Sequence, residues 1–107
     1  MSDGQKIIVL TTCESQEQAD SIARHLIEHR LAACVNILPA RSVYRWKEKI
    51  ESSPEHLLII KSRHDMLDRL RSSIQSLHTY ELPELIVLPI VDGSVAYLNW
   101  IDQELSQ

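Results

Sequence analysis

Glycine is very scarce in this chain of 107 residues, in which Gly4 and Gly93 are the only two. A dinucleotide-binding fingerprint, a Walker phosphate loop and the nucleophile elbow of many hydrolases each require at least two glycines close together. Two glycines near opposite ends of the chain cannot supply any of these motifs. The sequence therefore excludes the nucleotide-binding and hydrolytic classes that depend on them.

Cysteines and long apolar runs are also few. Cys13 and Cys34 form no CxxC pair, and a chain of this length can build a core without disulfides, which favours a reducing compartment. The apolar run at 7–10 is too short for the apolar segment of a signal peptide, and no run approaches the length of a membrane span. We therefore expect a cytoplasmic protein that does not enter a membrane.

Positive charge is in deficit, with 11 Lys and Arg against 15 Asp and Glu and a formal net charge of −4. A net negative chain lacks a general attraction for nucleic acid or for an anionic membrane. The apolar fraction of 44% is that of an ordinary globular protein, and this length allows one core but not two. The sequence predicts a single domain over residues 1–107 without a nucleic-acid partner.

The spacing of apolar residues predicts the order β-α-β-β-α-β followed by a C-terminal helix. A capping box, Ser15-x-x-Gln18, precedes the first helix, and Ser94 is placed to cap the last one. This order is that of the ferredoxin-like split βαβ fold, an α+β class with helices on one face of an antiparallel sheet. The expected strands are 6–12, 32–46, 50–62 and 85–90, and the expected helices are 16–30, 64–77 and 95–105.

The central β-hairpin is too long for its own domain. Its first strand, 32–46, reaches roughly 50 Å if straight, whereas a domain of this length is roughly 35 Å across. Pro39 and Pro54 are expected to interrupt the two strands. The far end carries Tyr44 and Trp46, two of only five aromatic residues. These rings either fold back onto their own core or, as we favour, pack on a neighbouring subunit.

The segment HLIEH, residues 25–29, matches the H-x-x-E-H signature of inverted zinc peptidases. His25 and His29 share a helix face and could hold zinc. The apolar arc of this helix, however, is centred on Ala19 and Leu26, so the two histidines lie on its solvated side. A chain this short also leaves little room for a cleft. The segment predicts a surface that binds nickel or zinc adventitiously.

The segment HTYELPEL, residues 78–85, combines more reactive groups than any other. A histidine after a helix often caps its negative end, and a tyrosine beside a proline often packs in a loop. We nevertheless expect His78, Tyr80, Glu81 and Glu84 to line a cleft between subunits, where the carboxylates meet a cation or the arginines of another chain. A small hydrolase or lyase that uses His78, Tyr80 and Glu81 is an alternative.

Five segments together resemble the divalent-cation tolerance (CutA) family, namely RLAACVNILP (30–39), SVYRWKEKIE (42–51), HLLIIKS (56–62), HTYELPELIVLPI (78–90) and YLNWI (97–101). The resemblance covers nearly the whole chain in order. It implies a ferredoxin-like protomer in a tight trimer whose long hairpins reach over neighbours. It also implies tolerance of copper and other divalent metals without an enzymatic reaction. The likeness of that architecture to PII-type signalling trimers suggests the alternative of an effector-binding trimer.

The chain departs from the family at the tip of the hairpin. Many members have a Tyr-x-Trp-x-Gly turn, whereas this sequence has Tyr44-x-Trp46-x-Glu48. The missing glycine predicts either another turn type or backbone strain at Glu48.

The chain also departs from the copper ligands proposed for some members, a cysteine that ends the first strand and two adjacent histidines. These positions fall on Thr11, Leu77 and His78, so His78 alone is retained. Cys13 follows two residues after Thr11, on the same strand face if the strand continues, and could replace the lost cysteine. We therefore expect no required cofactor, and copper binding at His78 and Cys13 that is weak or depends on a second subunit.

Overall fold

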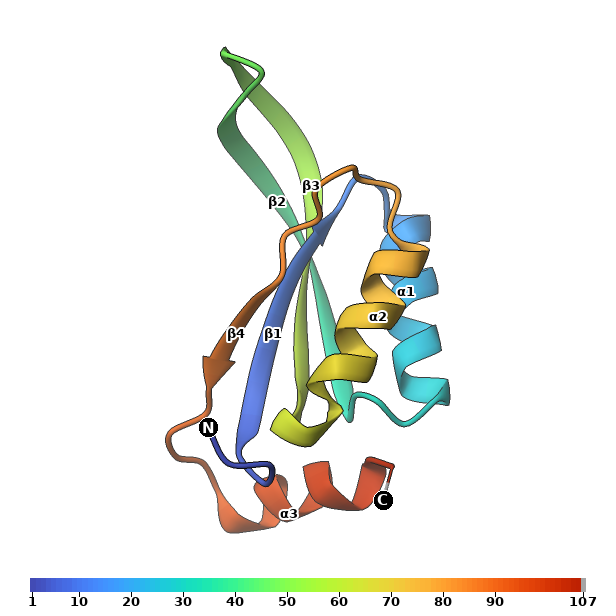
Figure 1. Ribbon diagram of the computed structural model, residues 1–107, viewed down its shortest axis with the longest axis vertical. Helices are drawn as coiled ribbons and strands as arrows, with labels where there is room; N and C mark the ends of the chain where they lie inside the picture. The colour runs from blue at the N-terminus through green and yellow to red at the C-terminus, as the bar shows by residue number, and fades with distance from the viewer. Residues whose placement is uncertain (107) are drawn as a thin grey trace.

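A four-stranded antiparallel sheet with helices on one face forms the centre of the computed structural model, which describes residues 1–106 (Figure 1). The strands lie in the order β2-β3-β1-β4. All predicted elements are present, with bounds that differ by at most three residues. The elements are β1 (Lys6–Cys13), α1 (Gln16–Glu28), β2 (Cys34–Trp46), β3 (Lys49–Arg63), the 3-10 turn η1 (His64–Met66), α2 (Leu67–Leu77), β4 (Ile86–Pro89) and α3 (Val95–Glu104).

The start of α1 confirms one half of the predicted capping box. The Ser15 hydroxyl accepts a hydrogen bond from the Gln18 N–H at 3.1 Å, which satisfies one free donor of the first turn. The Gln18 side chain does not return the bond to Ser15. Its Nε2 donates instead to the carbonyl oxygen of Leu77 at 3.1 Å, so it links the start of α1 to the end of α2.

Helix α1 ends at Glu28, two residues before the predicted end, because the chain reverses there. Arg30 takes a positive φ of 55°. Its N–H donates to the Ile27 carbonyl at 3.1 Å, and the Leu31 N–H donates to the Leu26 carbonyl at 2.9 Å. This pair of bonds is the Schellman motif, in which glycine is the usual residue at the position of Arg30.

The core lies between the sheet and the two helices α1 and α2, which cover the same face in Figure 1. In β1 the side chains alternate, so that Ile7, Val9, Thr11 and Cys13 are buried toward the helices. The largest fully buried apolar side chains are Ile7, Ile22, Leu26, Leu58, Ile60, Met66, Leu70, Ile74, Ile101 and Leu105.

The face of the sheet that lies away from α1 and α2 carries an apolar patch, beside the polar side chains of Asn36 and Lys61. We call it the open face, and it consists of Ile8, Leu10, Leu38, Leu57, Ile59, Ile86 and Leu88, which the pairing register places on one side. Leu38, Ile86 and Leu88 remain 43%, 47% and 44% exposed. Exposed apolar side chains gathered on one sheet face are typical of a surface that another chain covers.

The β2–β3 hairpin extends well beyond the rest of the sheet. Its strands pair from Cys34 and Lys61 to Trp46 and Lys49, whereas β1 last pairs with β3 where Cys13 faces His56. Residues 40–46 and 49–55 therefore form a two-stranded projection, here called the arm (Figure 1). The molecule measures 44 × 26 × 22 Å, in agreement with the overlong hairpin predicted from the sequence.

The predicted interruptions at Pro39 and Pro54 are wrong, because both strands run through these prolines in one unbroken register. Pro39 lies in β2, which is an edge strand, and Pro54 lies in β3 beyond the end of β1. Each strand thus has a side without a partner at its proline. A missing N–H can face that side without removing a bond from the ladder.

The tip of the arm is a two-residue turn without glycine. Lys47 and Glu48 have φ values of 51° and 69°, the left-handed conformation that a type I′ turn requires at both central positions. The structure thus has the backbone strain predicted at Glu48, because left-handed backbone brings the Cβ of an L-residue close to its carbonyl.

Helix α3 lies across the end of the sheet opposite the arm (Figure 1). The Ser94 hydroxyl accepts from the Tyr97 N–H at 3.2 Å, as predicted for this cap. Asp102 bonds Lys6 and Arg63 of the sheet, at 3.0 Å in each case. Within residues 1–106, no helix combines the length and apolar character that crossing a membrane requires.

Candidate functional site

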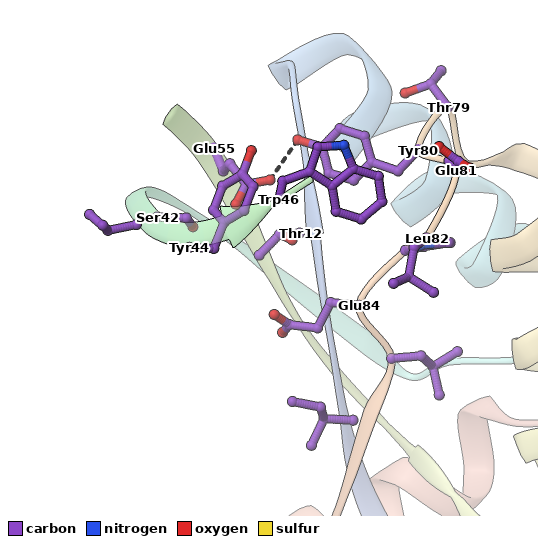
Figure 2. A pocket seen from close by; sticks show the side chains of 14 residues that line it. Thr12, Ser42, Tyr44, Trp46, Glu55, Thr79, Tyr80, Glu81, Leu82 and Glu84 are labelled. Carbon is purple, nitrogen blue, oxygen red and sulfur yellow. Dashed lines mark hydrogen bonds between the residues drawn. The ribbon is translucent and has the colours of Figure 1, made fainter. Parts of the chain in front are cut away.

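A cavity of about 880 Å³ opens between the arm and the segment 79–86 that follows α2 (Figure 2). Thr12 at the end of β1 forms part of its lining, and Glu55 forms another part from the base of the arm. Tyr80, Glu81 and Glu84, three of the four residues predicted for a cleft, line this cavity, whereas His78 does not. Tyr44 and Trp46, which were predicted to pack on a neighbouring subunit, also form part of the lining. Their location between subunits stays a prediction.

Glu55 is the anchor of the cavity and was not identified from the sequence. The Tyr80 hydroxyl donates to its carboxylate at 2.5 Å, drawn as a dashed line in Figure 2, and Glu55 is only 7% exposed. Burial, followed by the hydrogen bond and charge of Glu55, raises the pKa of the Tyr80 phenol well above its usual value. Tyr80 therefore remains a protonated donor. The available signal for Glu55 was a carboxylate placed shortly before the apolar run at 57–60.

The cavity is strongly acidic. Glu55, Glu81 and Glu84 contribute carboxylates, and no basic side chain forms part of the lining. Figure 2 shows Glu84 extending from the segment after α2 toward the arm. Among residues 1–106, none of these three carboxylates has an ion-pair partner. The cavity therefore repels anions and attracts cations.

Cys13 and His78, the two predicted metal ligands, lie close together beside this cavity. The distance from Cys13 Sγ to His78 Nε2 is 3.9 Å. The imidazole is already engaged, because His78 Nε2 lies 2.7 Å from the Thr12 carbonyl and its Nδ1 accepts from the Tyr80 N–H at 3.1 Å. These partners place the proton on Nε2. A metal must displace one of the two bonds to reach the ring.

The Cys13 thiol is buried and poorly disposed to ionise. Burial, assisted by the charges of Glu55 and Glu14, raises the pKa of Cys13 to about 11. Because metals bind the thiolate, this ligand is protonated and weak at neutral pH. Cys13 shares its strand face with Thr11, as predicted, and the fully buried Thr11 hydroxyl has no hydrogen-bond partner among the described residues. Residues 1–106 hold no group of three or more His, Cys, Asp or Glu placed to bind a metal ion.

The histidine pair of α1 is remote from this site. His25 and His29 stack with their ring centroids 4.1 Å apart. Both were predicted to lie on the solvated side of the helix; His29 is exposed, whereas His25 is half-buried. A His29 ring nitrogen, Nδ1, also donates to the His25 carbonyl at 2.9 Å. The pair therefore forms a surface feature of the helix and adds nothing to the cavity.

The catalytic alternative has little support from the geometry. The rings of His78 and Tyr80 are adjacent, with centroids 4.8 Å apart. However, both nitrogens of His78 and the Tyr80 hydroxyl are engaged in hydrogen bonds with the protein itself. A general acid or base must be free to exchange a proton with a substrate.

Comparison with known proteins gives consistent matches over almost the whole chain. The model of the family described as "CutA1 divalent ion tolerance protein" matches residues 7–104. Protein CutA, chloroplastic, of Arabidopsis thaliana is 43% identical over 89% of this chain and 53% of its own length. The divalent-cation tolerance protein CutA of Thermus thermophilus is 42% identical over 88% of this chain and 92% of its own. The chain thus spans about half of the plant relative.

The fold agrees with that of solved relatives. The structure described as the periplasmic divalent cation tolerance protein CutA from Archaeoglobus fulgidus superimposes with a TM-score of 0.92 at 36% identity. The match covers 94% of this chain and 99% of that one. Mixed α+β architecture with a four-stranded antiparallel sheet and three α-helices is therefore shared with these proteins.

The prediction of a cytoplasmic location is wrong, because relatives are described as chloroplastic and periplasmic. The inference of a reducing compartment from Cys13 and Cys34 failed for a structural reason. Cys13 faces His56 and Cys34 faces Lys61, so the thiols lie five positions apart along β3, or roughly 17 Å. Cysteines separated by more than about 7 Å cannot form a disulfide. These free thiols therefore do not report on the redox state of a compartment.

Proposed function

Because this chain belongs to the CutA1 divalent ion tolerance family, we propose that it contributes to tolerance of divalent metals, copper included, by binding metal weakly. The observation that supports a site in this chain is the approach of Cys13 Sγ to His78 Nε2 at 3.9 Å. A sulfur and an imidazole nitrogen suit copper or zinc better than magnesium or calcium. The proposal involves binding and requires no chemical reaction.

The donor set fits only a weak or shared metal site. Two protein ligands are fewer than the three or four that zinc sites use. The protonated thiol of Cys13 and the engaged ring of His78 both oppose metal entry. Further ligands would have to come from water or from a second subunit.

We further propose that the protomer is ferredoxin-like and assembles as a trimer. The strand order β2-β3-β1-β4 with α1 and α2 on one face supports the ferredoxin-like assignment. The open face supports assembly, because apolar surface of this kind gains free energy when another chain covers it. The arm projects beyond its own protomer, with Val43 and Ile50 68% and 71% exposed, and so can reach a neighbour.

The alternative of a trimer that binds an anionic effector is less well supported. The cavity presents Glu55, Glu81 and Glu84 without a compensating basic side chain in its lining. An anionic ligand would meet like charge in a partly desolvated site, which is unfavourable.

A copper titration tests the metal proposal. His25 and His29 are replaced by Asn in all proteins, and Cu(I) affinity is measured anaerobically against a chromophoric chelator. We expect His78→Ala and Cys13→Ser each to weaken binding, whereas Cys34→Ser serves as the matched control. Because binding displaces the thiol proton and the pKa of Cys13 is about 11, affinity should rise by up to about tenfold per pH unit between pH 6 and 8.

Equal copper affinity in the His78→Ala protein and its parent would show that His78 is not a metal ligand. A copper affinity that does not change with pH would likewise show that the Cys13 thiol is not a ligand.

A further inference from the structure

The histidine pair of α1 is a feature that neither the core nor the acidic cavity uses. His25 and His29 are one helical turn apart, with ring centroids 4.1 Å apart and an angle of 26° between the ring planes. The C-terminal end of α1, where the pair lies, is far from the arm, and α1 covers the opposite side of the sheet from the open face (Figure 1). The pair is therefore separate from the surfaces that assembly would cover.

The ring of His29 is already in the protonation state that a metal ligand requires. Its Nδ1 lies 2.9 Å from the carbonyl oxygen of His25. A carbonyl oxygen can only accept, so the proton is on Nδ1 and the lone pair of the neutral ring is on Nε2. Histidines that bind metals usually donate their other ring N–H to a carbonyl or carboxylate, which fixes the tautomer and the ring orientation. His29 makes this bond in the absence of metal, and it is exposed.

The ring of His25 supplies a second nitrogen donor. Within residues 1–106 its ring nitrogens have no hydrogen-bond partner, and neither is buried away from water. Zinc binds imidazole nitrogen at roughly 2.1 Å, so two nitrogens on one tetrahedral ion are roughly 3.3 Å apart. Rings with centroids 4.1 Å apart reach that separation through small side-chain rotations. The half-buried position of His25 also limits the rotamer freedom that binding would remove.

We propose that His25 and His29 form a two-imidazole chelate for a divalent transition metal, with Cu(II) preferred and water in the remaining coordination positions. Imidazole suits copper, nickel and zinc, and affinity among the divalent ions is highest for Cu(II). Binding here neither ionises a buried thiol nor breaks a hydrogen bond of the ring, in contrast to binding at Cys13 and His78.

The sequence predicted only adventitious binding of nickel or zinc at this helix. The fixed tautomer of His29 and the close approach of the two rings indicate an organised site instead. Two protein ligands are fewer than a structural zinc site uses, so the bound metal should exchange readily with a competing chelator. The inference does not rest on the proposed function, because it uses different residues and the other common oxidation state of copper.

A Cu(II) titration against a competing chelator tests the chelate in a Cys13→Ser/His78→Ala background, which lacks the other candidate ligands. We expect His29→Asn and His25→Asn each to weaken Cu(II) binding at least about tenfold. The matched control is His29→Asn/Ile27→His, which restores the number of histidines but places the new ring two positions from His25, on another side of the helix. This control should bind as weakly as His29→Asn alone, and circular dichroism should show that all variants fold.

Nuclear magnetic resonance of the ring nitrogens with Zn(II), which is diamagnetic, identifies the donor atom. We expect zinc to shift the Nε2 resonance of His29, while Nδ1 keeps its proton and its bond to the His25 carbonyl.

Three outcomes would overturn the inference: Cu(II) affinity that is unchanged by His29→Asn, equally tight binding by the control with the relocated histidine, or zinc coordination through Nδ1 of His29. The second outcome would identify adventitious binding by independent histidines. None of these results would affect the Cu(I) titration of Cys13 and His78, because that experiment uses proteins in which His25 and His29 are replaced.

Discussion

Three residues in positions 1–106 have the left-handed backbone that usually selects glycine, and none of them is glycine: Arg30, Lys47 and Glu48. Arg30 ends α1, and the other two form the tip of the arm. The scarcity of glycine that excluded several nucleotide-binding motifs thus also leaves strain in the folded chain. Each left-handed L-residue costs roughly 1–2 kcal/mol relative to its preferred conformation.

Glu48→Gly should therefore stabilise the protein. Glycine relieves the strain at φ 69° but adds freedom to the unfolded chain, so the net gain should be about 0.5–1 kcal/mol. The free energy of unfolding from urea denaturation measures it. Glu51→Gly is the control, because Glu51 lies within β3 and glycine there should be destabilising. A loss of stability in Glu48→Gly would mean that the Glu48 side chain makes a contact more important than the strain.

Helix α3 illustrates how one element is attached through charge. Asp102 pairs with Lys6 of β1 and Arg63 at the end of β3. Burial alone would raise the pKa of Asp102, but the hydrogen bonds and charges of Lys6 and Arg63 outweigh it and lower the pKa. A carboxylate with a lowered pKa in the folded state stabilises the fold above its unfolded pKa. That contribution is lost as pH falls through the folded value.

Asp102→Asn should reduce stability at pH 7 by about 1 kcal/mol or less, because the carboxylate is 40% exposed and water screens the pairs. The difference between variant and parent should begin to decrease as pH falls below about 4, where the unfolded carboxyl becomes protonated, and should disappear once the folded carboxyl is protonated as well. Thermal unfolding across pH measures both effects. Asp68→Asn, which removes a carboxylate that is 99% exposed, is the control and should have almost no effect. A difference that persists in acid would indicate a role other than charge.

Local signals predicted the elements better than they predicted interactions between them. Ser15 and Ser94 marked two helix starts correctly because a cap depends on a few adjacent residues. Pro39 and Pro54 misled because the effect of a strand proline depends on which neighbouring strands are present. The same limit applies to the cavity, since Glu55 meets Tyr80 only through tertiary structure.

At the scale of the whole molecule, the open face and the arm are surfaces that one protomer leaves exposed. Leu38, Ile86 and Leu88 on that face are each more than two-fifths exposed. The predicted trimer would cover them, and a neighbour's arm could then border the acidic cavity. The oligomeric state is thus the property that determines the environment of the candidate sites.

Light scattering at micromolar concentration should give about 37 kDa, three times the 12.3 kDa of one chain. Leu88→Asp should shift the protein toward monomer, because a buried unpaired charge costs about 3–5 kcal/mol per protomer. Ile27→Asp is the matched control, since Ile27 is similarly exposed at 42% but lies on α1, away from the open face. A parent protein of one chain mass, or equal assembly of the two variants, would contradict the trimer.

The order of strands in the sheet also determines how the chain can fold as it is synthesised. β2 and β3 meet across the two-residue turn at Lys47 and Glu48, so this hairpin can form as soon as both strands have emerged. β1 is made first, yet both of its neighbours, β3 and β4, come later in the chain. Pairing between distant segments is slow because a long loop must close before any contact forms. β1 therefore remains unpaired, with its apolar side chains uncovered, until the hairpin has formed and the edge of β3 is available to pair with it.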